Sequence, residues 1–349
     1  MMFRNFSIAA LGALALAGCQ DKAGGDAAGG SRSEIRIVGS STVYPFAKAV
    51  AERYASESGN KAPVLESTGT GGGIEQFCSG VGANTPDIAN ASRRMKKSEF
   101  ETCQKNGVSE IVEIEVGIDG IALAQAKGAK PLPLTPVQVY KALAAKPFGK
   151  EQTAKTWSDI DPALPATKIA VFGPPTTSGT RDAFNELIME AGCQTDSATK
   201  ALKDSAKEKY EAICHEMRTD GGYMDQGEND NLIVGKLVAN PEALGVFGYS
   251  YMEENADKVS GVALDGVVPT YASIAGGKYP GARKLYIYVK KAHVGKIPGL
   301  KEFAEAFAAA GATDGYLSKL GLIASPDDAR EAAKQAASGM TVLDGAQLK

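Results

Sequence analysis

Histidine is scarce in this chain, and a strong net charge is missing. His215 and His293 are the only histidines among 349 residues, which excludes a histidine-rich metal site. The formal net charge of -3 gives no global basic field, which excludes bulk attraction of nucleic acid. An anionic ligand would therefore need local donors. The content of 44% hydrophobic and 23% charged residues is typical of a globular chain, here long enough for two domains.

The motifs of several enzyme classes are missing as well. No G-x-S-x-G elbow occurs. The glycine-rich segment 67–73 lacks the Gly-Lys-Ser/Thr of a P-loop, and Ile74 stands where a dinucleotide fingerprint needs its last glycine. The acidic stretch 220–230 lacks the spacing of a calcium loop. We therefore expect no enzyme, no cofactor and no metal; a phosphatase is the enzyme alternative, and phosphate release from a model ester would favour it.

The N-terminus has the pattern of an export signal. Arg4 precedes an apolar stretch, Phe6 to Ala17, of about 12 residues, too short to span a bilayer as a helix. The stretch runs into Leu-Ala-Gly-Cys, ending at Cys19, which resembles a bacterial lipobox. The resemblance implies a signal peptide over 1–18, lipidation of Cys19, a flexible tether over 19–33 and membrane attachment by lipid alone. An ordinary signal peptide with a chance cysteine is the alternative.

Four cysteines remain once Cys19 is set aside: Cys78, Cys103, Cys193 and Cys214. An even number in an exported chain favours disulfides. Three pairings are possible. The local one joins Cys78 to Cys103 and Cys193 to Cys214, and each loop of about 20–25 residues would stabilise the fold by roughly 3 kcal/mol. A zinc site is the rival, which the lack of a C-x-x-C disfavours.

Short β-rich runs alternate with amphipathic helical stretches, which indicates an α/β fold. We expect a strand over 118–126 to cross into a second domain and a strand over 243–249 to return. These crossings place lobe I at 34–118 plus 251–349, and lobe II at 119–250.

A loop rich in Ser, Thr and Gly follows a strand and opens a helix at three places, 39–43, 67–73 and 176–181. The first turn of a helix has N–H groups without intrahelical partners, hydroxyls add rotatable donors, and the helix dipole favours negative charge. Each loop alone also fits an ordinary N-cap. The recurrence of three loops after strands favours a site that wraps a small oxyanion.

Two arginines lie beside such segments. Arg93 follows Asn-Ala-Ser at the end of a short strand, and Arg181 follows the third loop. The guanidinium group offers a planar fork that matches phosphate oxygens. A surface salt bridge is the alternative role for each.

In this combination and order, the motifs resemble the phosphate-binding proteins of ABC phosphate transporters, the PstS and SphX-like family. The likeness covers most of the chain after the signal. It implies a type II periplasmic-binding fold with two α/β lobes and two crossover strands. It also implies a periplasmic monomer that holds inorganic phosphate in the interlobe cleft and delivers it to an ABC permease of the inner membrane. The segments that carry the resemblance are 39–45, 68–74, 87–93, 119–122, 178–184 and 227–234.

The resemblance also implies which residues bind phosphate. The expected contacts are Ser41, Thr42, Val43, Thr70, Gly71, Ser92, Arg93, Ser178, Gly179, Thr180 and Arg181.

This chain departs from the family pattern at two positions. Many members have an aspartate where Ser92 stands, which accepts a hydrogen bond from protonated phosphate and so rejects sulfate, which has no proton to give. Many also have an arginine where Pro174 stands. Arg93 or Arg181 would then supply the charge. The further candidates are Asp119, Asp220 and Glu228 as acceptors and Arg218 as a donor. The departures affect selectivity for phosphate over sulfate more than oxyanion binding.

Two alternatives keep the same fold. One is a binder of another tetrahedral oxyanion, which competition calorimetry would reveal. The other is a surface or scavenging lipoprotein that feeds no transporter. Co-purification with a permease would favour delivery to a transporter over this alternative.

Overall fold

The computed structural model describes residues 32–227, 230–313 and 315–349. The expected signal peptide, Cys19, most of the tether and Glu228 lie outside these residues. Within the described ranges, no helix is both long and apolar enough to cross a bilayer.

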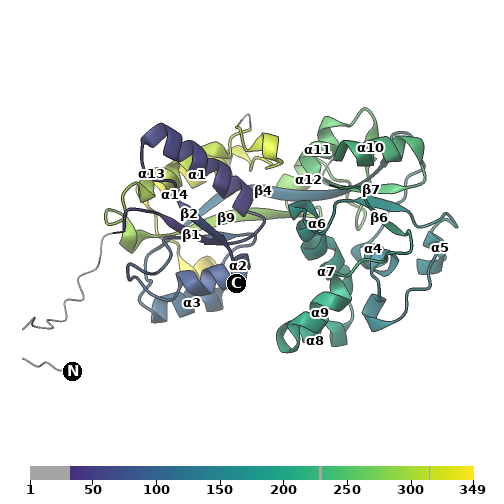
Figure 1. Ribbon diagram of the computed structural model, residues 1–349, viewed down its shortest axis with the longest axis horizontal. Coiled ribbons are helices and arrows are strands. Elements are labelled where there is room, and N and C mark those ends of the chain that lie inside the picture. Colours follow the sequence, from purple (N-terminus) through teal and green to yellow (C-terminus); the bar gives the residue numbers. More distant parts are fainter. Residues whose placement is uncertain (1–31, 228–229, 314) are drawn as a thin grey trace, which may run out of the picture. The chain divides into compact units, whose positions relative to one another are not determined.

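Strands and helices alternate along much of the chain, and helices follow one another directly over 136–160, 179–214 and 300–339 (Figure 1). The strands are β1 (Arg36–Gly39), β2 (Val64–Ser67), β3 (Ile88–Ala91), β4 (Ile111–Ala126), β5 (Val171–Gly173), β6 (Tyr223–Asp225), β7 (Leu244–Gly248), β8 (Val259–Gly261) and β9 (Ala282–Lys290). The helices are α1 (Tyr44–Ser58), α2 (Gly69–Phe77), α3 (Lys97–Lys105), α4 (Pro136–Leu143), α5 (Trp157–Ile160), α6 (Gly179–Phe184), α7 (Glu190–Cys193), α8 (Ser197–Ser205), α9 (Lys207–Cys214), α10 (Asp230–Ala239), α11 (Tyr249–Glu254), α12 (Tyr271–Ala275), α13 (Leu300–Ala310) and α14 (Asp327–Gly339).

The strands join in the order β2-β1-β3-β9-β4-β7-β5-β6, with β8 paired to β4. Strands β1, β2 and β3 are parallel to one another. Their carboxyl ends therefore lie at one edge of the sheet, where open α/β sheets bind ligands.

Lobe I consists of a sheet with helices on both faces. The sheet contains β1, β2, β3, β9 and the first half of β4. Side chains alternate along β9, so that Ile287 and Val289 pack with α1, α13 and α14, while Tyr286 and Tyr288 pack with α2 and α3. Covered on both faces, this sheet holds the carboxyl ends of its strands in fixed positions.

Lobe II has a core of its own around β5, β7 and the second half of β4. Trp157, Phe184 and Phe247 are fully buried there. The helical run that follows the third loop is continuous but changes type, because a π segment, Asn185–Met189, lies between α6 and α7.

Two long strands connect the lobes. Residues 111–120 of β4 pair with β9, whereas residues 121–125 pair with β7 (Figure 1). The strand at 243–249 was expected to return to lobe I, but β7 pairs with β4 and β5 of lobe II. Strand β9, which pairs with β3 and β4, is the return crossover.

This pairing bears on the domain boundary. The sequence prediction places 251–349 in lobe I, yet Met252, Ile274 and Tyr279 pack in the core of lobe II. We therefore propose that lobe II extends to the start of β9.

Both local cysteine pairs are disulfides. Cys78 bonds Cys103 and links α2 to α3, and Cys193 bonds Cys214 and links α7 to α9. The pairing that the sequence left open among three is thus the local one.

Candidate functional site

The first loop turns sharply out of β1. Gly39 has a φ of 127°, and a Cβ at this position would lie 2.2 Å from the carbonyl oxygen of Asn90. The carbonyl oxygen of Ser40 accepts a hydrogen bond from the amide of Tyr44 at 3.1 Å, and its hydroxyl accepts one from the amide of Val43 at 3.4 Å. The loop is therefore held by bonds within itself, and it places Thr42 just before Val43, the N-cap of α1.

Two side chains of lobe II fix the segment that leads into the third loop. The carbonyl oxygen of Pro174 accepts hydrogen bonds from the Tyr223 hydroxyl at 2.7 Å and from Arg181 Nη1 at 3.3 Å. Ser178 is the N-cap of α6, and its Oγ accepts from the amide of Thr180 at 3.3 Å. The loop thus enters its helix in a fixed orientation.

Residues of the first and third loops line one cavity of about 230 Å³. The cavity brings together hydroxyl and glycine residues of both lobes and the strand β4 that joins them. Its lining residues are Ser41, Thr42, Pro45, Phe46, Asp119, Gly120, Ile121, Ser178, Gly179, Thr180, Gly248, Leu320 and Gly321. Five expected contact residues, namely Ser41, Thr42, Ser178, Gly179 and Thr180, therefore lie around a common space.

The second loop lies beside the first but does not line this cavity. Its residues 69–73 already belong to α2, where a loop was expected, so Thr70 and Gly71 stand in the first turn of a helix. Thr70 Oγ1 lies 3.0 Å from Ser92 Oγ and accepts from the Ser92 amide at 3.0 Å. Thr70 and Ser92 thus form a neighbouring hydroxyl pair, and Gly71 follows Thr70 in the same helical turn. Val43 is fully buried at the start of α1.

The arginines expected at the site have other partners. Arg93 forms a two-pronged pair with Glu99 at 2.9 and 2.6 Å. Arg181 is buried, with its guanidinium 4.5 Å from the centre of the Tyr223 ring. Arg218 donates to Asp220 and to two backbone carbonyls of lobe II. None of these three lines the described cavity.

Sequence reasoning missed Arg283, in β9. Its Nη2 donates to Thr42 Oγ1 at 2.8 Å, its Nε to Asp119 Oδ2 at 3.3 Å, and its Nη1 to Glu186 Oε2. Thr42, Asp119 and Glu186 come from the first loop, from β4 and from the helical run of lobe II. The sequence carries little signal for it, because Arg283 shares its strand with Lys284 and Lys290 and follows no recognisable motif.

Asp119 sits in an unusual electrostatic position. Burial raises the pKa of its carboxyl group and Glu186 adds to the rise, while Arg283 opposes it. A carboxyl group that is reluctant to ionise can accept or share a proton with a ligand.

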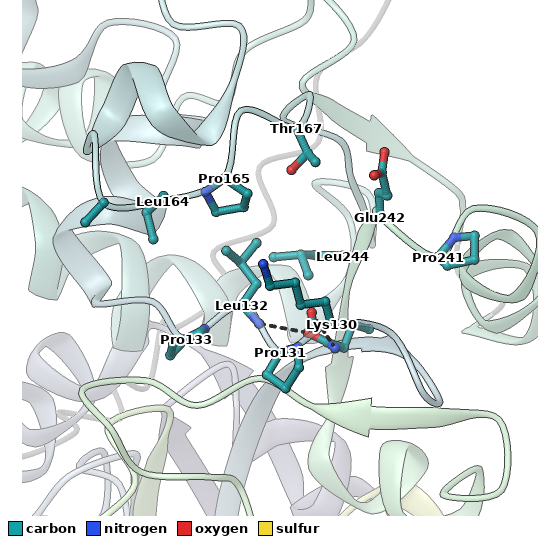
Figure 2. A pocket seen from close by; sticks show the side chains of 12 residues that line it. Lys130, Pro131, Leu132, Pro133, Leu164, Pro165, Thr167, Pro241, Glu242 and Leu244 are labelled. Carbon is teal, nitrogen blue, oxygen red and sulfur yellow. Dashed lines mark hydrogen bonds between the residues drawn. The ribbon is translucent and has the colours of Figure 1, made fainter.

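A second cavity, of about 360 Å³, lies in lobe II beside β7 (Figure 2). Four prolines contribute to its wall, and the side chain of Gln125 is engaged by the backbone of Ala129, Lys130 and Leu132. None of the three loops reaches it. The side-chain donors in its wall are Lys130, Gln125 and Thr167, and it lacks the two helix-opening hydroxyl loops that line the interlobe cavity, so the interlobe cavity is the better candidate. Among the described residues, no group of three His, Cys, Asp or Glu side chains is placed to hold a metal ion.

Comparison with known proteins agrees with this arrangement. The sequence profile of the PBP superfamily domain matches residues 24–310. The chain belongs to this superfamily. Protein SphX of Synechococcus elongatus is 32% identical over 280 residues, covering 76% of this chain and 72% of SphX. Phosphate-binding protein PstS of Staphylococcus saprophyticus is 28% identical over 304 residues, covering 85% of this chain and 83% of PstS.

Solved structures of the superfamily show the same fold. A possible phosphate-binding protein from Planctomyces limnophilus superposes with a TM-score of 0.70 at 29% identity, over 88% of this chain and 98% of that one. An ABC-type phosphate transport receptor from Vibrio cholerae superposes with a TM-score of 0.55 at 19% identity, over 83% of this chain and 99% of that one. The expected two-lobed type II periplasmic-binding fold is confirmed.

Proposed function

We propose that this PBP superfamily member captures inorganic phosphate in the cavity between its lobes and delivers it to an ABC importer. It acts as a receptor without catalysis, in the periplasm. It is held at the membrane by lipid on Cys19, and it works as a monomer.

One observation carries the proposal: hydroxyl-bearing loops of both lobes line the same small cavity. Ser41 and Thr42 come from lobe I, and Ser178 and Thr180 come from lobe II. Neutral donors at helix N-termini bind oxyanions without a competing counter-ion. An anion bound by both loops joins the lobes, and that link is the contact a closing receptor needs.

The names of the relatives support the choice of ligand. SphX, PstS and the Planctomyces protein resemble this chain over most of their lengths, and two of the three are described as binding phosphate. Ser92 lies beside Thr70 as a hydroxyl and not a carboxylate, which keeps sulfate as the competing ligand.

Calorimetric titration with phosphate, then with sulfate, tests the proposal. The protein should begin at Gln20, because Arg32 pairs with the buried Asp87 at 2.8 Å and is worth retaining. We expect Thr42→Val and Thr180→Val each to weaken phosphate binding about tenfold, in line with the loss of one hydrogen bond to a charged group. Thr102→Val, on the exposed face of α3, is the matched control.

The outcomes separate the alternatives. Binding of neither anion would refute the receptor function, and equal binding of both would remove the preference for phosphate. Loss of membrane attachment in Cys19→Ser tests the anchor, and co-purification with a permease tests delivery to a transporter.

A further inference from the structure

We propose that Arg283 supplies the positive charge that binds the anion, and that the Glu186 carboxylate competes with the anion for it. The inference rests on the proposed function and names the residues that carry its electrostatics. It assigns the charge to a crossover strand and not to any of the three loops.

Arg283 is not itself one of the lining residues, but it donates hydrogen bonds to two of them. Its guanidinium donates to Thr42 Oγ1 at 2.8 Å and to Asp119 Oδ2 at 3.3 Å. Both acceptors are part of the cavity wall. Only 13% of the Arg283 side chain is exposed, so its charge is poorly screened by water.

The strand register fixes this arrangement. Arg283 of β9 stands opposite Asp119 of β4 in the antiparallel pair that connects the lobes. A side chain on such a strand keeps its place while loops adjust, which suits a group that must meet a ligand in one geometry.

Three other arginines were candidates from the sequence, and among the residues that the structure describes, none of their guanidinium groups donates to the cavity wall. Arg181 Nε is buried without a hydrogen-bond partner among the described residues, and its Nη1 donates to the Pro174 carbonyl and not to the wall. Arg93 pairs with Glu99, Arg218 with Asp220, and Arg181 with the Pro174 carbonyl and the Tyr223 ring. Of these four arginines, Arg283 is the one whose hydrogen bonds go to cavity-lining side chains.

The carboxylates around Arg283 compete with an anion for its positive charge. One guanidinium faces two carboxylates, Asp119 and Glu186, so the ionised cluster is net negative and repels an anion. Burial raises the pKa of Asp119, and the neighbouring Glu186 carboxylate acts in the same direction.

Glu186 differs from Asp119 in its access to water. The Glu186 side chain is 40% exposed, compared with 14% for Asp119. Glu186 can therefore turn into solvent at a small desolvation cost and leave Nη1 of Arg283 to an oxygen of the anion. Asp119 stays in place, where it can accept a hydrogen bond from a protonated anion.

Two substitutions with opposite effects test the idea. Glu186→Gln removes the competing charge, so phosphate should bind roughly three- to tenfold more tightly at low salt, and the gain should shrink as salt rises. Arg283→Gln should weaken binding roughly 30-fold or more, because a charge-assisted bond in a dry site is lost. Arg283→Lys keeps the charge but not the planar fork, so its affinity for phosphate should lie between that of the unsubstituted protein and that of Arg283→Gln.

The controls remove similar charges away from the cavity. Glu305→Gln removes a carboxylate of similar exposure, 37%, that pairs with Lys301 on α13. Arg53→Gln removes a guanidinium that pairs with Glu57 on α1. Both should leave the affinity for phosphate unchanged.

All variants are titrated calorimetrically with inorganic phosphate, and folding is checked by thermal unfolding. If the unsubstituted chain binds phosphate but Glu186→Gln binds no more tightly than Glu305→Gln, the competition is refuted. Normal affinity in a folded Arg283→Gln would refute the assigned charge. If that variant does not fold, normal affinity in Arg283→Lys together with no gain in Glu186→Gln would refute it instead. If the unsubstituted chain binds no phosphate, the proposed function itself fails, and this inference fails with it.

Discussion

A Cβ atom on Gly73 would lie 2.3 Å from the Cα atom of Gly39. Helix α2 thus packs its backbone directly on the turn that opens the first loop. Gly39 in turn leaves no room for a side chain beside the carbonyl oxygen of Asn90. Glycine therefore allows close contact at two points, between α2 and the end of β1 and between the ends of β1 and β3. We expect this stack of backbone contacts to set the position of Thr42.

The first prediction tests this stack. Gly73→Ala should displace α2 from the first loop, destabilise the protein by about 1–3 kcal/mol, as overpacking does, and weaken phosphate binding several-fold. Gly72→Ala is the matched control, because its nearest contact would be Thr68 Cβ at an ordinary 3.8 Å. Alanine there should be neutral or stabilise the helix by up to about 1 kcal/mol. Urea unfolding and calorimetry on both variants measure the difference, and equal behaviour would contradict the role of the stack.

Local sequence signals found the loops and the helix that follows the first one. The helix expected over 45–58 is α1, Tyr44–Ser58, with Pro45 in its first turn and Gly59 at its end in the left-handed conformation. Such signals depend on residues close in the chain, namely a fixed proline φ and a glycine that tolerates positive φ. The same local logic failed at 69–73, because four glycines in five residues disfavour a helix until packing against Gly39 stabilises it.

Long-range pairing could not be predicted from the sequence. Strand β7 and residues 285–289 of β9 are both uncharged runs, and periodicity does not say which neighbour a strand will join. Arg283 and Asp119 are 164 residues apart and meet only through the register of β9 with β4. The candidate charge of the site was therefore assigned to Arg93 and Arg181, which stand next to recognisable motifs.

The second prediction concerns Arg181, which braces the third loop from within lobe II. Arg181→Gln should lose the contact with the Tyr223 ring and the charged donor to the Pro174 carbonyl. The free energy of unfolding should fall by about 2 kcal/mol. Its effect on phosphate affinity should be smaller than that of Arg283→Gln. Thermal unfolding and calorimetry on the two variants give both quantities. A larger affinity loss in a stable Arg181→Gln protein would place Arg181 in contact with the ligand.

The third prediction concerns the disulfide between α2 and α3. Replacing Cys78 and Cys103 by serine opens a loop of 25 residues and should cost about 3 kcal/mol in the chain-entropy model. Because α2 rests on Gly39, the double variant should also bind phosphate more weakly. The matched double variant at Cys193 and Cys214, with a separation of 21 residues, should lose similar stability. Urea unfolding and calorimetry measure both, and a stronger binding loss in the second variant would contradict this assignment.

The fourth prediction is a pH dependence set by Glu190, at the start of α7. Lys203 Nζ lies 2.5 Å from its Oε2, the Tyr210 hydroxyl donates to Oε2 at 2.8 Å, and His215 Nε2 lies 2.9 Å from Oε1. Burial alone would raise the pKa of Glu190, but hydrogen bonds with His215, Lys203 and Tyr210 outweigh it and lower the pKa from 4.5 to about 2.

A carboxyl group with a lowered pKa in the folded state stabilises the fold while it is ionised. Its contribution is complete above the unfolded value near 4.5 and is lost as pH falls through about 2. Glu190→Gln should therefore reduce the free energy of unfolding by on the order of 2 kcal/mol at pH 7, and the gap to the unsubstituted protein should close towards pH 2. Glu305→Gln removes an exposed i,i+4 partner of Lys301 and should cost at most about 0.5 kcal/mol at pH 7. Urea unfolding from pH 7 to pH 2.5 measures the gap, and a gap of constant size would mean that packing, and not the charge of Glu190, holds these helices together.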